Sequence, residues 1–175
     1  MKKKICIIRS GDITYISRIH RTALALCENK NNDVVVISIE PKRKPATEAT
    51  FSPYKMIFVP ILSRITQHII FLPLRAIEGI CKTLFNAAKL KADIYMPITF
   101  EDLVIAYIVT RFNRKIIVYN TNELEADRRR VRNTSINTLL NKYVRFIEGN
   151  ILRRIKYIIA ADYEKLNELS AEKNM

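Results

Sequence analysis

The chain has 175 residues, of which 49% are hydrophobic and 27% charged, and it carries a formal net charge of +13. This length and balance fit one globular domain and exclude a disordered chain. The basic excess lies in residues 42–91 and 126–156, each with nine Lys or Arg against two acidic residues. Basic segments attract phosphate groups on nucleic acids, anionic lipids or nucleotide and lipid diphosphates, and charge alone does not choose among these.

Strand and helix patterns alternate along the chain. Short apolar, β-branched runs predict strands at 4–8, 34–37, 54–62, 92–96, 115–119 and 157–160. Helical spacing predicts helices over 13–29, from Pro73 onward, over 101–112 and 135–153, and from about 162. This order predicts a single α/β domain with a doubly wound, Rossmann-like parallel sheet and helices on both faces. Ligands of such sheets bind beyond the carboxyl ends of the strands, which directs attention to residues 9–13, 97–102 and 120–134.

Two helices have apolar faces that we expect to be buried. On the first helix the face contains Ile16, His20, Ala23, Leu24 and Cys27. On the helix after Pro73 it contains Leu74, Ile77, Ile80 or Cys81, and Leu84 or Phe85. The basic segment 63–91 leaves two interpretations, a core helix with basic outer positions or an amphipathic helix lying on an anionic bilayer.

The three cysteines are far apart, form no CxxC pair, and each lies in an apolar stretch. We therefore expect Cys6, Cys27 and Cys81 to be reduced and buried, in a reducing compartment. The apolar run after the N-terminal lysines ends after four residues, so it predicts a strand and not an export signal. The apolar segment 56–74 contains Arg64, Gln67 and His68, and it fails as a transmembrane helix.

Four loops supply candidate site residues. Gly11 and Asp12 follow the first strand, where helix-start amides can bind phosphate or form a plain turn; neither GxGxxG nor a P-loop is present. Glu101 and Asp102 begin a helix beyond the fourth strand, where a carboxylate either caps the helix or polarises a substrate hydroxyl.

After the fifth strand, Asn120, Asn122 and Glu123 suit hydrogen bonding to sugar hydroxyls or ordinary turn chemistry. The cations Arg128, Arg129, Arg130 and Arg132 form either a solvated loop or a contact with phosphate or membrane. His20 is expected to be a hydrogen-bonded core histidine. No zinc or calcium ligand spacing occurs, and no metal is expected.

Several stretches resemble, in order, the N-terminal domain of GT-B-fold retaining glycosyltransferases of the group 1 (family 4) class. Residues 18–37 look like that family's first helix and second strand, and 92–97 look like its A-D-(I/V)-(Y/V)-H-A-H strand. Residues 115–125 look like its K-x-(I/V)-Y-D-x-H-E-L segment, and 148–161 like its E-x-x-x-L-R-R-x-D-x-V-I-A-V-S segment. The chain departs from the family at Met96, Ile98 and Asn122, where histidines are usual, and at Asn120, which replaces an aspartate.

The resemblance implies the acceptor-side half of an enzyme that moves a sugar from a nucleotide diphosphate to an acceptor hydroxyl, in polysaccharide or glycolipid synthesis. It implies that the donor binds in a second domain with an E-x7-E motif, which this chain lacks, so the 175 residues are expected to be inactive alone. They would be a segment of a longer enzyme or need a partner chain.

The expected catalytic residues are Glu101, Asp102, Asn122 and Glu123, and the expected partners are a sugar or lipid-linked acceptor and an anionic membrane surface. The expected location is cytoplasmic, at the inner membrane face. The alternative is a basic, non-enzymatic module that binds nucleic acid or phosphate; because few aromatic residues accompany the charges, nucleic acid is not the expected partner.

Overall fold

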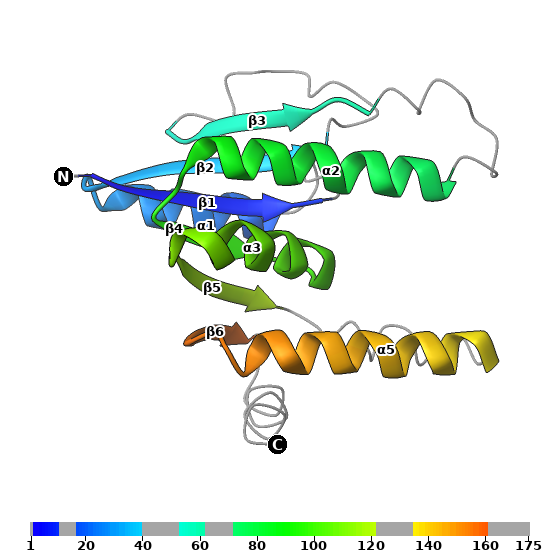
Figure 1. Cartoon of the computed structure of the whole chain (residues 1–175). Helices are drawn as coiled ribbons and strands as arrows, with labels where there is room; N and C mark the ends of the chain where they lie inside the picture. Colours follow the sequence, from blue (N-terminus) through cyan, green and yellow to red (C-terminus); the bar gives the residue numbers. More distant parts are fainter. Residues whose placement is uncertain (1, 11–16, 40–52, 62–71, 122–134, 161–175) are drawn as a thin grey trace.

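The computed structural model describes residues 2–10, 17–39, 53–61, 72–121 and 135–160, which form a parallel sheet flanked by helices (Figure 1). The strands are β1 (Lys3–Arg9), β2 (Asn32–Ile39), β3 (Lys55–Val59), β4 (Ile94–Pro97), β5 (Ile116–Thr121) and β6 (Tyr157–Ala160). The helices are α1 (Ser17–Glu28), α2 (Leu72–Leu90), α3 (Phe100–Asn113) and α5 (Ser135–Leu152).

The sheet has the strand order β3-β2-β1-β4-β5-β6, and every strand pair is parallel. The chain builds outward from β1 to β3, then returns to the other side of β1 and builds outward again to β6. The order therefore reverses between β1 and β4, which is where doubly wound sheets bind ligands. The sheet confirms the predicted Rossmann-like α/β fold.

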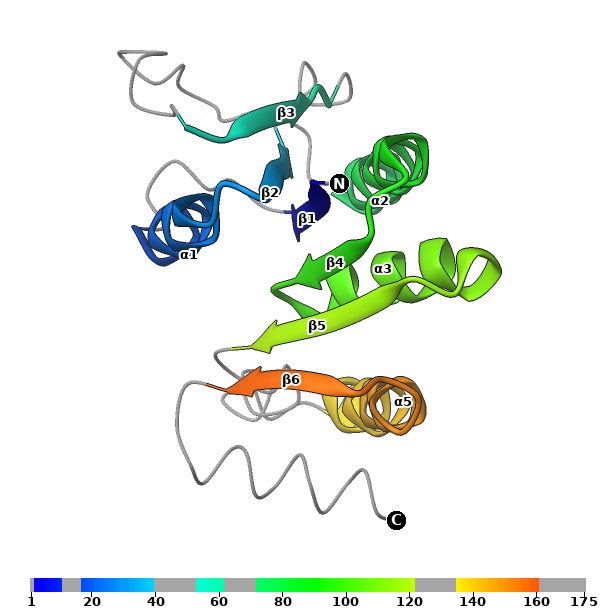
Figure 2. The same cartoon turned by 90° about the vertical axis from the view of Figure 1, so that its left-hand side faces the viewer.

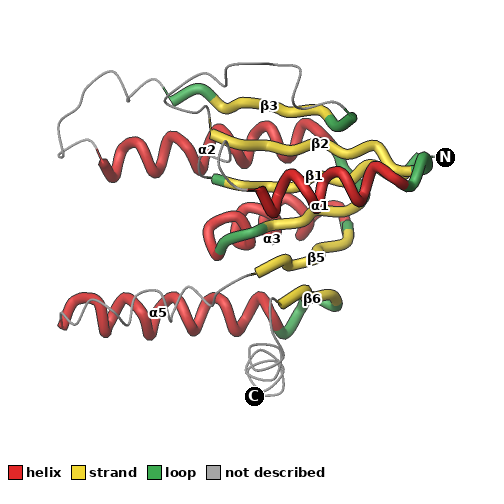
Figure 3. Tube along the Cα trace, turned by 180° about the vertical axis from the view of Figure 1, so that it is seen from behind, coloured by secondary structure: helices red, strands yellow, loops and turns green. Residues whose placement is uncertain are grey.

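Helices cover both faces of the sheet. Figure 2 shows α1 on one face and α2, α3 and α5 on the other, and Figure 3 shows α1 from behind, lying over β1 and β2. Strands buried on both faces read as continuous apolar runs, and residues 5–8 of β1 and 34–39 of β2 are accordingly all buried. The larger core cluster joins the sheet to α2, α3 and α5, and the smaller one joins it to α1.

A capping box starts α3 at the carboxyl end of β4. The Thr99 side chain accepts a hydrogen bond from the Asp102 amide, and the Asp102 carboxylate accepts one from the Thr99 amide. The helix ends at Arg114, whose φ of 49° places it in the left-handed region. Because α3 packs against the sheet between α2 and α5, its buried residues include Leu103, Ile105 and Val109 on more than one side.

The prediction of a buried large-residue stripe on α2 is wrong. Most of its members are exposed: Leu74 (53%), Ile77 (58%), Ile80 (36%), Cys81 and Phe85 (67%). The side that meets the sheet instead carries Gly79, Thr83 and Ala87, spaced four residues apart. A Cβ added to Gly79 would lie 3.2 Å from Ile39 Cδ1, so the small residues let the helix approach the sheet closely.

Two further burial predictions need correction. Leu24 on α1 is exposed, while Ile19 and Ala23 on the same helix are buried against the sheet. Among the cysteines only Cys6 is fully buried, and burial raises the pKa of its thiol to about 12. Cys27 is half-buried and Cys81 is exposed, so neither is a core thiol. Within the described ranges, none of the helices has the length and apolarity needed to cross a membrane.

Candidate functional site

The candidate site lies where β1 and β4 end side by side. Ile8 pairs with Pro97 at the end of this parallel register, so Arg9 and Ser10 after Ile8 lie next to the turn at Ile98 and Thr99. The N-terminus of α3 begins at the same place. This arrangement brings polar groups from two strand ends and one helix start together at the reversal of strand order, where doubly wound sheets have their ligand crevice.

Asp102 joins the two sides of this crevice. Its Oδ1 accepts a hydrogen bond of 2.6 Å from the Ser10 amide, and its Oδ2 accepts bonds from the Thr99 amide (3.0 Å) and the Thr99 hydroxyl (2.7 Å). The side chain is fully buried, and this burial raises the carboxyl pKa against the opposing effect of its hydrogen bonds and Arg9. The predicted capping role is confirmed for Asp102, and its described contacts hold β1 to α3.

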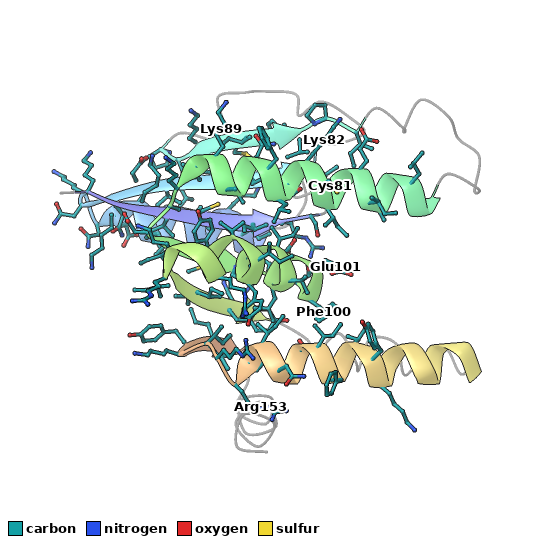
Figure 4. The ribbon with its side chains drawn as sticks, viewed as in Figure 1. Cys81, Lys82, Lys89, Phe100, Glu101 and Arg153 are labelled. Atoms are coloured by element: carbon teal, nitrogen blue, oxygen red, sulfur yellow. The ribbon has the colours of Figure 1, made fainter. Side chains whose placement is uncertain are left out.

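Glu101 differs from its neighbour. It is half-buried, and within the described part of the chain it forms no hydrogen bond or ion pair. Figure 4 shows Glu101 and Phe100 at the start of α3, at the end of the molecule to which the strand arrows point. A carboxylate in this position can accept a hydrogen bond from a ligand, whereas Asp102 already uses both oxygens.

Asn120 is buried at the end of β5, and its side chain contacts α1, which covers the face of the sheet opposite α3. Its side-chain oxygen accepts a 3.1 Å bond from Arg18 Nη2, and its Nδ2 lies 3.8 Å from the Met96 sulfur as a weak donor. Asn120 thus holds Arg18, from the first turn of α1, over the carboxyl ends of β4 and β5. A guanidinium there adds positive charge to the crevice.

A second arginine contributes from β1. Arg9 is half-buried, and its Nε is inaccessible to solvent and has no hydrogen-bond partner in the described part of the chain. Its charge lies close enough to Asp102 to lower that carboxyl's pKa, although burial is the larger effect. Two guanidinium groups, of Arg9 and Arg18, and two carboxylates, of Glu101 and Asp102, therefore lie along the carboxyl edge of the sheet.

Two of the three positions where the resembled family has histidines are apolar at this edge, Met96 and Ile98. Met96 is buried, and Ile98 is half-buried and packs against the core cluster beneath α1. Neither can exchange a proton at neutral pH. Any acid–base role at this edge must come from other residues, and among the described side chains Glu101 is the carboxylate with free oxygens.

The described contact of His20 is with a tyrosine that precedes β3. One ring nitrogen, Nδ1, forms a hydrogen bond with the Tyr54 hydroxyl, and Tyr54 is buried next to β3. This contact agrees with the expectation of a hydrogen-bonded histidine.

The remaining predicted site residues lie outside the described residues: Gly11, Asp12, Asn122, Glu123, Arg128, Arg129, Arg130 and Arg132. Their roles stay predictions. In the ranges that are described, no group of three His, Cys, Asp or Glu side chains could hold a metal ion.

Sequence reasoning missed Arg18 and the backbone amide of Ser10. Arg18 is a cation one turn into the helix after β1, which a search of first-turn residues at the carboxyl edge could have found. The Ser10 contact uses only its amide, so no side-chain pattern signals it.

No family model matches the chain, and no curated protein matches it in sequence. Solved structures share its fold. A sucrose-phosphate synthase from Thermosynechococcus elongatus is 13% identical with a TM-score of 0.62, over 95% of this chain and 81% of that one. Anabaena HepE, in complex with UDP and glucose, is 13% identical with a TM-score of 0.58, over 99% of this chain and 41% of HepE.

Phytolacca americana UGT2, in complex with UDP-2-fluoro-glucose and pterostilbene, is 13% identical with a TM-score of 0.51. The match covers 70% of this chain, which spans only 31% of UGT2. At these identities the comparisons establish a shared fold, a Rossmann-like α/β domain.

Proposed function

We propose that the chain is the acceptor-side lobe of a glycosyltransferase that uses a nucleotide-diphosphate sugar in polysaccharide or glycolipid synthesis. The observation that carries the proposal is the polar carboxyl edge of β1, β4 and β5, where Arg9, Glu101 and the bonded pair of Arg18 and Asn120 lie, on a fold shared with HepE and UGT2. Charged and amide groups at a strand-order reversal suit a polar, hydroxyl-bearing ligand.

In this proposal Glu101 accepts a hydrogen bond from the acceptor hydroxyl. That contact orients the oxygen for attack on the sugar carbon that bears the diphosphate, which leaves as the new bond forms. Asp102 acts through the backbone by fixing the distance between Ser10 and the start of α3. Asn122 and Glu123, with Gly11 and Asp12, are proposed to complete the acceptor site.

The donor is proposed to bind mainly outside this chain. The chain spans under half of HepE and about a third of UGT2. A nucleotide sugar needs contacts to its base, diphosphate and sugar, and the crevice supplies polar groups for one side of such a ligand. We therefore propose that the 175 residues alone do not turn over a nucleotide sugar.

We further propose that the protein works in the cytoplasm at the inner membrane face. Support comes from the exposed side of α2, where Leu74, Ile77 and Phe85 lie within one of the two basic windows of the sequence. A helix with this pattern can bury its apolar side chains among lipid chains while nearby cations meet anionic headgroups. Arg128 and its neighbours are proposed to contact phosphate or membrane as well.

The direct test measures release of nucleoside diphosphate from a panel of nucleotide sugars by the complete protein that contains this chain. Changing Glu101→Gln should lower kcat at least about 100-fold, because it removes the hydroxyl's proton acceptor. Glu28→Gln is the matched control, since Glu28 is exposed at the far end of α1. Equal activity of Glu101→Gln and the control would contradict the role of Glu101. Absence of turnover, with nucleic-acid affinity that falls steeply with salt, would favour the non-enzymatic alternative.

A further inference from the structure

A second basic site lies at the opposite edge of the sheet, where β5 and β6 begin. The ends of α3 and α5 and the first residues of these strands line an open pocket of about 440 Å³. Five cations line it: Arg111, Arg114, Lys115, Arg154 and Lys156. Among the residues that the structure describes, no carboxylate lines it.

Two of these arginines are held together by one tyrosine. The Tyr107 hydroxyl oxygen accepts a 3.1 Å bond from Arg111 Nη1 and a second bond from Arg154 Nη1. The Arg154 guanidinium also lies 5.9 Å from the centre of the Tyr107 ring, within range of a cation–π contact. Tyr107 thus holds together two like charges, one from α3 and one from the turn that follows α5.

Most of the positive charge in the pocket is not compensated by carboxylates. Lys115 forms a 2.9 Å ion pair with Asp93, whose carboxyl pKa is lowered chiefly by that hydrogen bond. Arg111, Arg114, Arg154 and Lys156 form no ion pair with any described residue. These four are exposed, so water and salt screen them when the pocket is empty.

The partial negative charges at the C-termini of α3 and α5 compensate only part of the positive charge of the four unpaired cations. Cations are favoured at helix C-termini, and each terminus carries roughly half a negative charge. The ends of α3 and α5 together therefore offset about one of the four unpaired cations. An excess of roughly three positive charges remains.

We propose that this pocket binds a phosphate group, as a free diphosphate or as an anionic lipid headgroup, independently of the acceptor crevice. Guanidinium groups donate paired hydrogen bonds that match phosphate oxygens, and Arg111 and Arg154 are already held close together by Tyr107. Binding would relieve the repulsion among the four cations. The pocket lies at the amino ends of the strands, so its ligand does not occupy the proposed acceptor site at their carboxyl ends.

The test uses the 175-residue chain, calorimetry with inorganic pyrophosphate and a constant ionic strength. Arg154→Gln and Arg111→Gln should each weaken binding at least about tenfold, or about 1.4 kcal/mol, because each removes a hydrogen bond between charged groups. Arg153→Gln is the matched control, because Arg153 is the exposed neighbour of Arg154 and points away from α3 (Figure 4). The control should change affinity less than about twofold, since it alters only the distant charge.

A second arm distinguishes the source of the phosphate by sedimentation with phosphatidic acid vesicles and with phosphatidylcholine vesicles. Loss of phosphatidic acid binding in Arg154→Gln, with retention in Arg153→Gln, supports a headgroup ligand. Pyrophosphate binding without that difference supports a free diphosphate. Absence of saturable binding in both arms, or equal losses in Arg153→Gln and Arg154→Gln, overturns the proposal. Thermal melts of each variant check that the fold is intact.

Discussion

Asp102→Asn offers a sharp test of what holds the candidate crevice together. An amide has one acceptor oxygen, whereas the carboxylate accepts from the Ser10 amide on one oxygen and from Thr99 on the other. Whichever way the asparagine turns, at least one partly buried backbone N–H, of Ser10 or Thr99, faces an NH₂ group. An unsatisfied buried donor costs about 1–3 kcal/mol.

Taking about 2 kcal/mol, the melting temperature should fall by roughly 4–8 °C, given about 2–4 °C per kcal/mol for a domain of this size. Differential scanning calorimetry at pH 7 measures the change. Glu101→Gln is the control: it removes a neighbouring carboxylate from the same helix turn but breaks no described hydrogen bond, so its shift should stay within about 2 °C.

The pH dependence of the free energy of unfolding shows whether burial or hydrogen bonding has the larger effect on the pKa of Asp102. Burial raises the folded-state pKa of Asp102 above its unfolded value, so the native protein binds more protons than the unfolded chain between those two pKa values. The contribution of Asp102 to the free energy of unfolding therefore increases as the pH falls through the folded pKa. The deficit of Asp102→Asn should grow on acidification. A deficit that shrinks towards acid pH would refute the dominance of burial, and no deficit at pH 7 would contradict the stabilising role of the hydrogen bonds to Asp102.

Two other substitutions test the unusual packing of α2. Gly79→Leu should destabilise the fold by about 1–3 kcal/mol in urea unfolding, because a side chain there meets Ile39 and Ile61, while Gly79→Ala should be far milder because its Cβ fits with a small shift. Phe85→Ser should change the free energy of unfolding by no more than about 0.5 kcal/mol, since Phe85 is mainly exposed, yet it should reduce sedimentation with phosphatidylglycerol vesicles. Leu24→Ser, at an exposed position on the opposite face, is its control, and equal vesicle binding by both variants would contradict the membrane role of α2.

The sheet was predictable because its buried strands are continuous apolar runs in the sequence. Continuous apolar runs such as 34–37 mark strands buried on both sides, and their alternation with helical segments specifies a parallel sheet. The orientation of α2 was not predictable from the same rules. They assign the largest apolar residues to the core, but α2 meets the sheet through Gly79, Thr83 and Ala87, because small residues permit close approach.

The candidate site was predictable in position and only partly in composition. The strand ends placed Glu101, Asp102 and Asn120 at one edge, and the structure brings these residues to that edge. Asp102 is buried and hydrogen-bonded, whereas Glu101 is half-buried and unpaired among the described residues. This difference depends on a contact between Ser10 and Asp102, which are 92 residues apart in the sequence. Spacing along one helix carries no information about such a contact.

The bond from Ser10 to Asp102 also determines which sequence changes the crevice can absorb. Because the donor is a main-chain N–H, it is present whatever side chain occupies position 10, with proline as the one exception. The acceptor belongs to a particular side chain, so position 102 has no such freedom. A loop following β1 can therefore be exchanged for another of different chemistry while its first amide still docks on the same carboxylate. The loop after β1 can therefore change the side chains that it offers to a ligand, while the bond to Asp102 keeps its first residue in place.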